Sequence, residues 1–537
     1  MSINDIVSQA ISRRRFLTLS GLGLAGSLVG CSNTPTYPNN TIPTASKSTP
    51  TVVPTKQLPP GEADWSQLAK SLQGTLIRPD NANYATSRQL FSTRFDSILP
   101  AAIAYCASSA DVQACLAFVR HFNVPVTARS GGHSYAGYST TTGLVLDLTR
   151  MNTVTVNTGA RTATIGGGAH LIDVYSVLAQ HGMVIPAGSC PTVGIAGLTM
   201  GGGVGVLGRK FGLTCDNLLS AQIVLANGNL LTCNPQTNPD LFWALQGGGG
   251  GNFGIATSFT FQVHPVAALS LFTLNWPWES AAKVVDAWQH WGPQAPDELW
   301  SNCLLLGATN KSAGPTVRVN GVYVGEAGPL NALLAQLTSQ VGVAPSSRYV
   351  FTDPLLDTMM VEAGCYGESV AACHLPNQNS LGHVARDTSK AKSDYYSSTL
   401  PLQAINSLVD AINQRQASPS LSGGGIGMDS YGGAINRVAA NATAFVHRDA
   451  LFSIQYTASW NAADPVSVAS ANNQWLNSMW QAMRPYVNGE AYQNYIDPNL
   501  TNWQQAYYGA NLSRLQHVKA TYDPDNLFQF AQSITRA

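Results

Sequence analysis

The chain has 537 residues, more than a single hydrophobic core usually holds, so we expect at least two domains. Lysine plus arginine and aspartate plus glutamate number 29 each, which excludes the basic excess that proteins use to bind nucleic acid or an anionic membrane surface. Only 11% of the residues are charged, which is typical of an exported protein built from strands and loops.

Residues 1–31 carry the pattern of an export signal. Arg13, Arg14 and Arg15 precede an apolar run over 17–30 that is too short for a comfortable membrane span. This predicts a twin-arginine signal, which exports folded proteins with their cofactor in place through the twin-arginine machinery. The run ends at Cys31 in a sequence that matches a lipoprotein processing box, so we expect a lipid-anchored protein of the cell envelope. Ordinary cleavage nearby, giving a secreted protein, is the alternative.

Residues 32–62 are rich in Ser, Thr, Pro and Asn, which predicts a flexible tether. No later apolar stretch reaches the length of a membrane span, so membrane contact would depend on a lipid at Cys31. The nine cysteines include no Cys-x-x-Cys pair, and we therefore expect no metal site. Two cysteine pairs could form a disulfide, Cys106 with Cys115 or Cys365 with Cys373, and the sequence does not decide between them.

Short strands alternate with helices over residues 63–266, which predicts an α+β domain. We expect helices at 111–122 and 171–180, the second ended by Gly182. The expected strands are 124–128, 144–148, 154–156 and 162–165.

Residues 267–485 contain runs in which aromatic and polar side chains alternate, namely 271–276, 316–324 and 452–460. They predict a second domain around an antiparallel sheet. The last segment, 486–537, is again dense in motifs, and we expect it to return to the first domain.

His133 and Cys190 each lie in a glycine-rich context, Arg-Ser-Gly-Gly-His-Ser-Tyr and Gly-Ser-Cys-Pro-Thr-Val-Gly. An imidazole nitrogen and a thiolate can both bond to carbon, and glycines let the backbone approach a flat ligand. The pair therefore predicts a doubly tethered flavin in a redox enzyme. The alternatives are a turn histidine that caps backbone and a cysteine that only fills the core.

Two segments, 203–208 and 249–254, satisfy the G-x-G-x-x-G pattern of nicotinamide-binding folds. That fold requires a preceding strand, a following helix and an acidic residue about 20 positions on. The first segment is followed by Arg209 and Lys210, and the second follows a helical stretch at 240–246. We interpret both as loops that donate backbone N–H groups to a flavin cofactor.

From about Trp65 to the end, the ordered motifs resemble the berberine bridge enzyme-like branch of the vanillyl-alcohol oxidase flavoproteins. The motifs are those of His133 and Cys190, the Gly-Gly-Gly-Gly-Asn-Phe-Gly-Ile run and a Tyr-x-Asn-Tyr segment near the C-terminus. The resemblance implies a two-lobed FAD-binding domain of the vanillyl-alcohol oxidase type and a substrate domain with an antiparallel sheet. It also implies FAD bound covalently through His133 and Cys190. The motif residues that it assigns to the cofactor are His133, Cys190, Arg129, Ser130, Gly131, Gly132, Ser134, Gly188, Val193, Gly194, Gly197, Gly201, Gly202, Gly203, Gly205, Asn252, Phe253, Gly254, Ile255, Tyr508 and Asn511.

Alcohol oxidation by hydride transfer to FAD also requires a base for the hydroxyl proton. The resemblance gives this role to Tyr495, with Asp429 as its partner and Tyr135 near the substrate. A phenol has an ordinary pKa near 10, and a neighbouring carboxylate raises it further. We therefore expect Asp429 to orient Tyr495 or to take a relayed proton. The alternatives are a packed aromatic for Tyr495, a core residue for Tyr135 and a turn residue for Asp429.

Three positions bear on the substrate and the electron acceptor. Val204 replaces a tyrosine that is common in carbohydrate-oxidising relatives, and Leu198 replaces a common histidine, so the sequence names no specific substrate. Val193 matches relatives that react with oxygen, which favours an oxidase of an alcohol or hemiacetal carbon that uses O2. A dehydrogenase with another acceptor, or a non-catalytic binder that keeps the fold, is the alternative.

Overall fold

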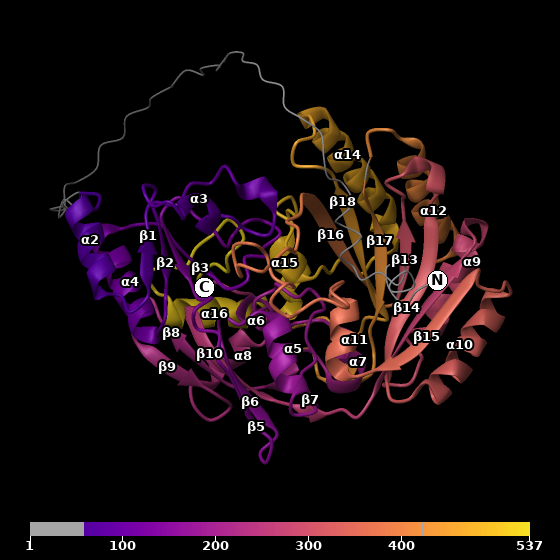
Figure 1. Cartoon of the computed structure of the whole chain (residues 1–537), viewed down its shortest axis with the longest axis horizontal. Coiled ribbons are helices and arrows are strands. Elements are labelled where there is room, and N and C mark those ends of the chain that lie inside the picture. Colours follow the sequence, from indigo (N-terminus) through magenta and orange to yellow (C-terminus); the bar gives the residue numbers. More distant parts are fainter. Residues whose placement is uncertain (1–57, 422) are drawn as a thin grey trace, which may run out of the picture.

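The computed structural model describes residues 58–421 and 423–537, so the expected export signal and nearly all of the tether lie outside the described residues. Two parts lie side by side (Figure 1). One holds a four-stranded, a five-stranded and a two-stranded sheet, the last formed by β7 and β11, and the other holds one large sheet with helices on its outer face. Among the described helices, none combines the length and the apolar character needed to cross a membrane.

The first small sheet has the order β1-β2-β4-β3, in which β2, β4 and β3 run parallel and β1 is antiparallel at the edge. Helix α4 connects β2 to β3. It begins where the Ser108 side chain accepts the Asp111 N–H, and it ends at Asn123 in the left-handed conformation. The bounds are α2 Glu62–Ser71, β1 Thr75–Ile77, α3 Tyr84–Ser87, β2 Ala102–Tyr105, α4 Ser109–Phe122, β3 Val126–Arg129 and β4 Leu144–Asp147.

The second small sheet is antiparallel, with the order β5-β6-β10-β8-β9. Helices α5, α6 and α8 contribute to the hydrophobic core beside it. The bounds are β5 Val154–Asn157, β6 Thr162–Gly166, α5 Leu171–Ala179, β7 Met183–Val184, α6 Ile195–Met200, α7 Gly208–Phe211, β8 Leu218–Val224, β9 Leu230–Cys233, α8 Pro239–Leu245, β10 Ile255–Gln262 and β11 His264–Pro265.

The large sheet has seven antiparallel strands in the order β15-β12-β14-β13-β17-β18-β16. Side chains alternate between its faces, so Leu305 and Ile454 pack under the helices while Leu304 and Gln455 face the other part of the molecule. The bounds are β12 Leu269–Trp276, α9 Ala281–Trp291, β13 Leu299–Leu306, β14 Thr316–Val324, α10 Ala327–Val341, β15 Ser347–Asp353, β16 Ser389–Tyr396, α12 Leu402–Ala417, β17 Gly423–Ser430, α13 Ala434–Arg437, β18 Phe452–Ser459 and α14 Val466–Met483.

Two segments cross back from the large sheet to the first part. Helix α11 (Leu355–Glu362) packs against α5, and the following loop contains the disulfide Cys365–Cys373. Cys106 and Cys115, the other expected pair, are buried thiols. Helices α15 (Trp503–Tyr508) and α16 (Leu512–Tyr522) lie against the first part, and the Lys519 ammonium donates to the Asn252 carbonyl there. The predicted α+β fold with an antiparallel second sheet is therefore confirmed.

Candidate active site

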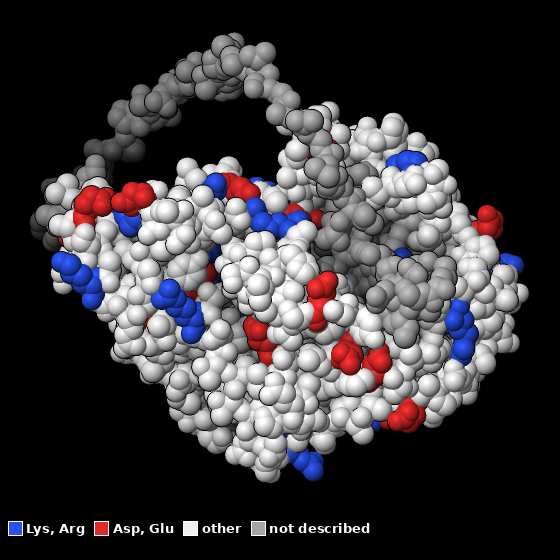
Figure 2. All heavy atoms as spheres, viewed as in Figure 1, with Lys and Arg blue, Asp and Glu red and all other residues white. Residues whose placement is uncertain are grey.

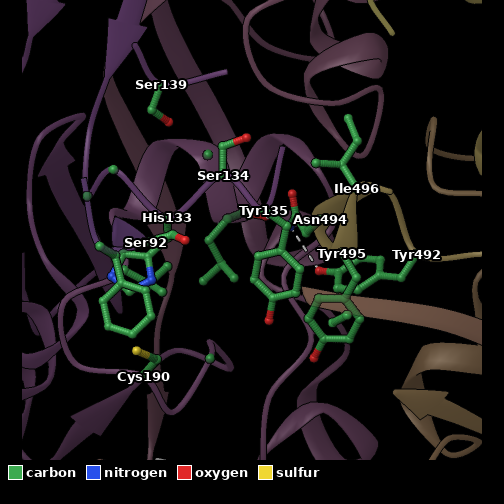
Figure 3. A pocket seen from close by; sticks show the side chains of 18 of the residues that line it. Ser92, His133, Ser134, Tyr135, Ser139, Cys190, Tyr492, Asn494, Tyr495 and Ile496 are labelled. Atoms are coloured by element: carbon green, nitrogen blue, oxygen red, sulfur yellow. Dashed lines mark hydrogen bonds between the residues drawn. The ribbon is translucent and has the colours of Figure 1, made fainter. Parts of the chain in front are cut away.

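A cavity of about 790 Å³ lies between the large sheet and the loops of the first part. Figure 3 shows His133 and Cys190 together on one side of it, and Tyr135 and Tyr495 together on the other. The large sheet contributes Leu304, Leu306, Arg318, Gly427, Gln455 and Thr457. Both parts of the molecule thus form the walls of one chamber.

The two loops that carry His133 and Cys190 contact each other through glycines. A Cβ on Gly131 would lie 2.2 Å from the Gly194 nitrogen, and a Cβ on Gly194 would lie 2.0 Å from the Ser130 hydroxyl oxygen. Real Cβ atoms do not approach other atoms so closely, so only glycine allows these backbones to meet. This contact places an imidazole and a thiol, 57 residues apart in the sequence (190 − 133), at the edge of one cavity.

The His133 ring is held in one orientation. Its Nε2 lies 2.8 Å from the Thr192 hydroxyl oxygen, and its face stacks on Phe91 with ring centres 4.2 Å apart. Thr192 is fully buried, so this hydrogen bond is shielded from water. Such support on both an edge and a face orients the ring toward the cavity.

Three tyrosines and a glutamine form the opposite side. The rings of Tyr135 and Tyr495 stack with centres 5.4 Å apart, and Tyr492 meets Tyr495 edge to face at 4.9 Å. The Tyr492 hydroxyl accepts the N–H groups of Gly203 and Val204, and burial raises the pKa of this phenol. On the large sheet, the Gln455 amide donates to the Tyr135 hydroxyl over 2.9 Å.

The shape of the cavity fits a flat cofactor that backbone must approach closely. Gly249 has a φ of +89°, and a Cβ there would lie 2.9 Å from the Tyr508 hydroxyl oxygen, so a side chain is excluded at this wall. The 249–252 loop, the 130–134 loop and the start of α6 all present backbone to the same space. FAD, which has a planar ring and a long phosphate-containing tail, fits such a glycine-walled chamber.

Comparison with known proteins agrees with this geometry. The family described as "FAD binding domain" matches residues 100–234, and the family "Berberine and berberine like" matches residues 491–535. Berberine bridge enzyme-like 21 of Arabidopsis thaliana is 32% identical over 463 residues, which cover 81% of this chain and 83% of that protein. An FAD-linked oxidoreductase of Bacillus subtilis, YgaK, is 34% identical over 468 residues, 86% of this chain and 97% of that protein.

The chain belongs to the berberine bridge enzyme-like family.

Solved structures of this family share its fold over almost their whole length. BBE-like 1 of Physcomitrella patens has a TM-score of 0.80 and 32% identity, covering 88% of this chain and 99% of its own. A chitooligosaccharide oxidase has a TM-score of 0.77 and 28% identity, covering 89% and 100%. The family, the FAD cofactor and an FAD-linked oxidase activity, all predicted from the motifs, are thereby confirmed.

Most of the residues expected at the site of this berberine bridge enzyme-like oxidase do line its cavity. They are His133, Cys190, Ser130, Gly131, Gly132, Ser134, Tyr135, Gly188, Val193, Gly194, Gly197, Asn252, Gly254, Ile255, Tyr495 and Tyr508. The others lie outside the cavity wall, namely Arg129, Gly201, Gly202, Gly203, Gly205, Phe253, Asp429 and Asn511.

Several of the residues outside the wall have contacts that support it from behind. Arg129 forms a buried ion pair with Asp147 at 2.5 Å, and the Asn511 amide donates to the Ala440 carbonyl over 2.7 Å. A Cβ on Gly201 would lie 2.0 Å from the Asn494 side chain, so this glycine lets the Tyr-x-Asn-Tyr segment approach α6.

Asp429, expected beside Tyr495, is a buried residue on β17 opposite Ser453 of β18 and is not among the residues that line the cavity, so its pairing with Tyr495 stays a prediction. Gln455, two residues beyond Ser453 along β18, donates its amide N–H to the Tyr135 hydroxyl. Sequence reasoning also missed Arg318, which lines the cavity. Burial lowers the pKa of its guanidinium to about 10, which still leaves the group cationic at neutral pH. Neither Gln455 nor Arg318 lies in a recognisable motif. Thr192, in contrast, lies two residues after Cys190 in the same motif, so its place at the site could have been predicted from the sequence.

Proposed function

We propose that the enzyme carries FAD attached through both His133 and Cys190 and oxidises an alcohol or hemiacetal carbon with O2 as the acceptor. The observation that carries the proposal is the meeting of the two loops at Gly131 and Gly194, which brings both nucleophiles to one cavity. A single attachment would not require that contact. Each bond to the ring is expected to raise its reduction potential, and about 30 mV on a two-electron couple is a tenfold change in equilibrium.

Bound FAD supplies the acceptor for a hydride from the substrate carbon. The protein must supply the base, and we assign the substrate hydroxyl proton to the Tyr495 oxygen. Tyr135 lies face to face with it and receives an N–H donated by Gln455. A neutral amide donor favours a phenolate, whereas a carboxylate would oppose one. The Gln455 amide therefore adds no negative charge beside the two stacked tyrosine rings, which suits proton removal by Tyr495.

Val193 supports oxygen as the electron acceptor. It lies on the cavity wall beside Cys190. Two solved variants of the related protein Phl p 4 differ by one isoleucine-to-valine substitution, and the valine form is named a glucose oxidase while the other is named a glucose dehydrogenase. A dehydrogenase with another acceptor is the competing proposal, and oxygen uptake with H2O2 release during turnover separates the two.

The substrate is a sugar-like hemiacetal or a small hydrophobic alcohol. Relatives include the chitooligosaccharide oxidase and a monolignol oxidoreductase of Arabidopsis thaliana. Leu198, Val204, Leu304 and Leu306 give the cavity apolar wall, while Arg318 adds a cation. A peroxide-coupled screen of reducing oligosaccharides against aromatic alcohols tests both classes, and turnover of neither class would refute this assignment.

Flavin attachment is tested by denaturation. We expect acid-precipitated wild-type protein to stay yellow, each of His133→Ala and Cys190→Ala to keep one covalent bond, and the double variant to release all flavin. His290→Ala, at an exposed histidine, and Cys233→Ala, at a buried cysteine outside the cavity, are matched controls that should retain it. Free FAD released from denatured wild-type protein, or covalent flavin kept by the double variant, would refute the proposal.

We further propose export through the twin-arginine route with a lipid on Cys31. The support is the sequence of residues 1–31, which lie outside the described part of the chain. Cell fractionation of the wild type against Arg14→Lys/Arg15→Lys and Cys31→Ala tests both steps. The first change should keep the protein in the cytoplasm, and the second should release it from the envelope. A protein that stays in place in both variants would contradict the assignment.

The surface agrees with a small-molecule enzyme rather than a nucleic-acid binder. Figure 2 shows basic and acidic side chains scattered over the visible face, with no continuous basic area.

A further inference from the structure

Near the loop that carries His133, two histidines and an aspartate come together. His170 precedes α5, Asp173 lies in its first turn, and His374 comes from the loop that contains the Cys365–Cys373 disulfide. One ligand atom of each residue lies within 4.8 Å of the other two. They line a second cavity of about 390 Å³, which leaves room for a solvent ligand.

The hydrogen bonds of His374 determine which of its nitrogens faces the aspartate. Its Nδ1 lies 2.9 Å from the Val370 carbonyl oxygen, and because a carbonyl only accepts, Nδ1 carries the proton. In the neutral ring Nε2 then presents a lone pair, and this atom lies 3.0 Å from the Asp173 carboxylate oxygen. A lone pair and a carboxylate repel each other unless a positive charge, either a second ring proton or a metal ion, lies between them.

His170 completes the group. Its Nδ1 lies 3.9 Å from the same Asp173 oxygen, and its side chain is only 7% exposed. Its Nε2 is buried and makes no hydrogen bond to any residue in 58–421 or 423–537. A buried imidazole whose Nδ1 faces a carboxylate and whose Nε2 has no protein partner, beside a second imidazole, matches the ligand set of a divalent transition metal.

The separations also fit. Zinc binds nitrogen and carboxylate oxygen at about 2.0–2.2 Å, so two ligands of a tetrahedral site lie roughly 3.3–3.5 Å apart. The two separations that involve Asp173, 3.0 and 3.9 Å, lie on either side of this value, and all three ligand atoms lie within 4.8 Å of one another. The backbone carbonyl on His374 Nδ1 is the outer contact that commonly orients a metal-bound histidine. The nearby guanidinium of Arg129 is already neutralised by Asp147.

We propose that His170, Asp173 and His374 bind a divalent zinc-type cation that fastens the 365–384 loop to α5. The site needs no bound flavin and is distinct from the oxidase centre. Its position ties it to that centre, because the Leu171 and Ile172 N–H groups donate to the Val193 and Pro191 carbonyls of the Cys190 loop.

The 365–384 loop also contacts the loop that carries His133. From the 365–384 loop, the Gln378 amide donates to the Gly131 carbonyl over 3.5 Å, and the Asn377 amide donates to the Gln89 carbonyl over 3.2 Å. A cation between α5 and the 365–384 loop would therefore restrain both cofactor loops. Its role would be structural, with water as the remaining ligand.

Tag-free wild-type protein is incubated with ZnCl2, desalted and analysed for zinc by mass spectrometry. We expect about one zinc per chain in the wild type. Asp173→Asn and His374→Gln should weaken zinc binding by at least the roughly 10–100-fold that loss of an outer contact costs. His383→Gln is the matched control, since His383 lies on the same loop, is 61% exposed and belongs to no such group.

Thermal unfolding provides the second measurement. After chelation, added zinc should raise the melting temperature of the wild type and His383→Gln but not that of Asp173→Asn or His374→Gln. Flavin absorbance and circular dichroism show which variants are folded, and either ligand variant alone is sufficient for the comparison. Absence of retained zinc in the wild type would show that a proton on His374 balances Asp173, and the proposal would be wrong. Equal zinc retention in all four proteins would also overturn it.

Discussion

Gly194→Ala tests whether contact between the two cofactor loops is what brings His133 and Cys190 to one cavity. Gly194 has φ −82° and ψ 137°, which alanine adopts freely, so the cost of the substitution is steric. The added methyl would lie 2.0 Å from the Ser130 hydroxyl oxygen and 2.2 Å from the Gly131 nitrogen. Overpacking usually costs about 1–3 kcal/mol, and we expect the upper part of this range because one clashing atom is backbone.

A loss of about 3 kcal/mol in the free energy of unfolding corresponds to a fall in melting temperature of roughly 6–12 °C for a domain of about 200 residues, the size of the FAD-binding domain. Separation of the loops should also reduce the fraction of flavin that remains bound after denaturation. Gly328→Ala is the control, because a Cβ at this site in α10 meets no atom within 4 Å. If Gly194→Ala matched the wild type in both melting temperature and covalent flavin, the loop contact would not be responsible for the geometry of the site.

Three other substitutions test separate parts of the structure. Gln455→Glu replaces the N–H donor to Tyr135 by a carboxylate, so kcat at pH 7 should fall by roughly tenfold or more and its pH profile should move to higher pH. An unchanged pH profile of kcat would show that Gln455 does not influence proton transfer. Burial raises the pKa of Asp387 from 3.8 to about 6, so the folded protein binds this proton more tightly and loses up to about 3 kcal/mol as the pH rises from 4 to 6. Asp387→Asn should therefore gain stability over the wild type above pH 6 in denaturant titrations, and a difference that is constant with pH would contradict this reasoning. Cys365→Ser/Cys373→Ser opens a loop with a sequence separation of 8, which should cost about 2.5 kcal/mol in the oxidised protein, and a reductant should remove the difference.

Local chemistry was readable in the sequence because it depends on neighbours along the chain. The strands at 316–324 and 144–148 follow from alternating or continuous apolar runs, and the structure places β14 at Thr316–Val324 and β4 at Leu144–Asp147. The glycines beside His133 and Cys190 likewise predicted that the backbone of these loops approaches other groups closely. Both residues line the cavity that those motifs predicted.

Contacts between distant segments were not readable, because nothing in a local pattern determines which strand faces which loop. Tyr135 accepts a hydrogen bond from Gln455, 320 residues away, and Asp429 lies two residues from the position opposite Gln455 on the neighbouring strand. The choice between two cysteine pairs of similar spacing also depended on the fold, which brings the Cα atoms of Cys365 and Cys373 to 5.9 Å.

The proposed cation site shows the same limit. The expectation of no metal site rested on the absence of Cys-x-x-Cys, a local pattern, whereas the proposed ligands Asp173 and His374 are separated by 201 residues. The sequence by itself determined the family and the cofactor and predicted the two nucleophiles, since each is encoded in a short run with its own backbone requirement. Only the tertiary structure decided which side chains from the large sheet complete the site and which groups meet near it. The physical reason is that burial and packing, not spacing along the chain, bring those side chains together.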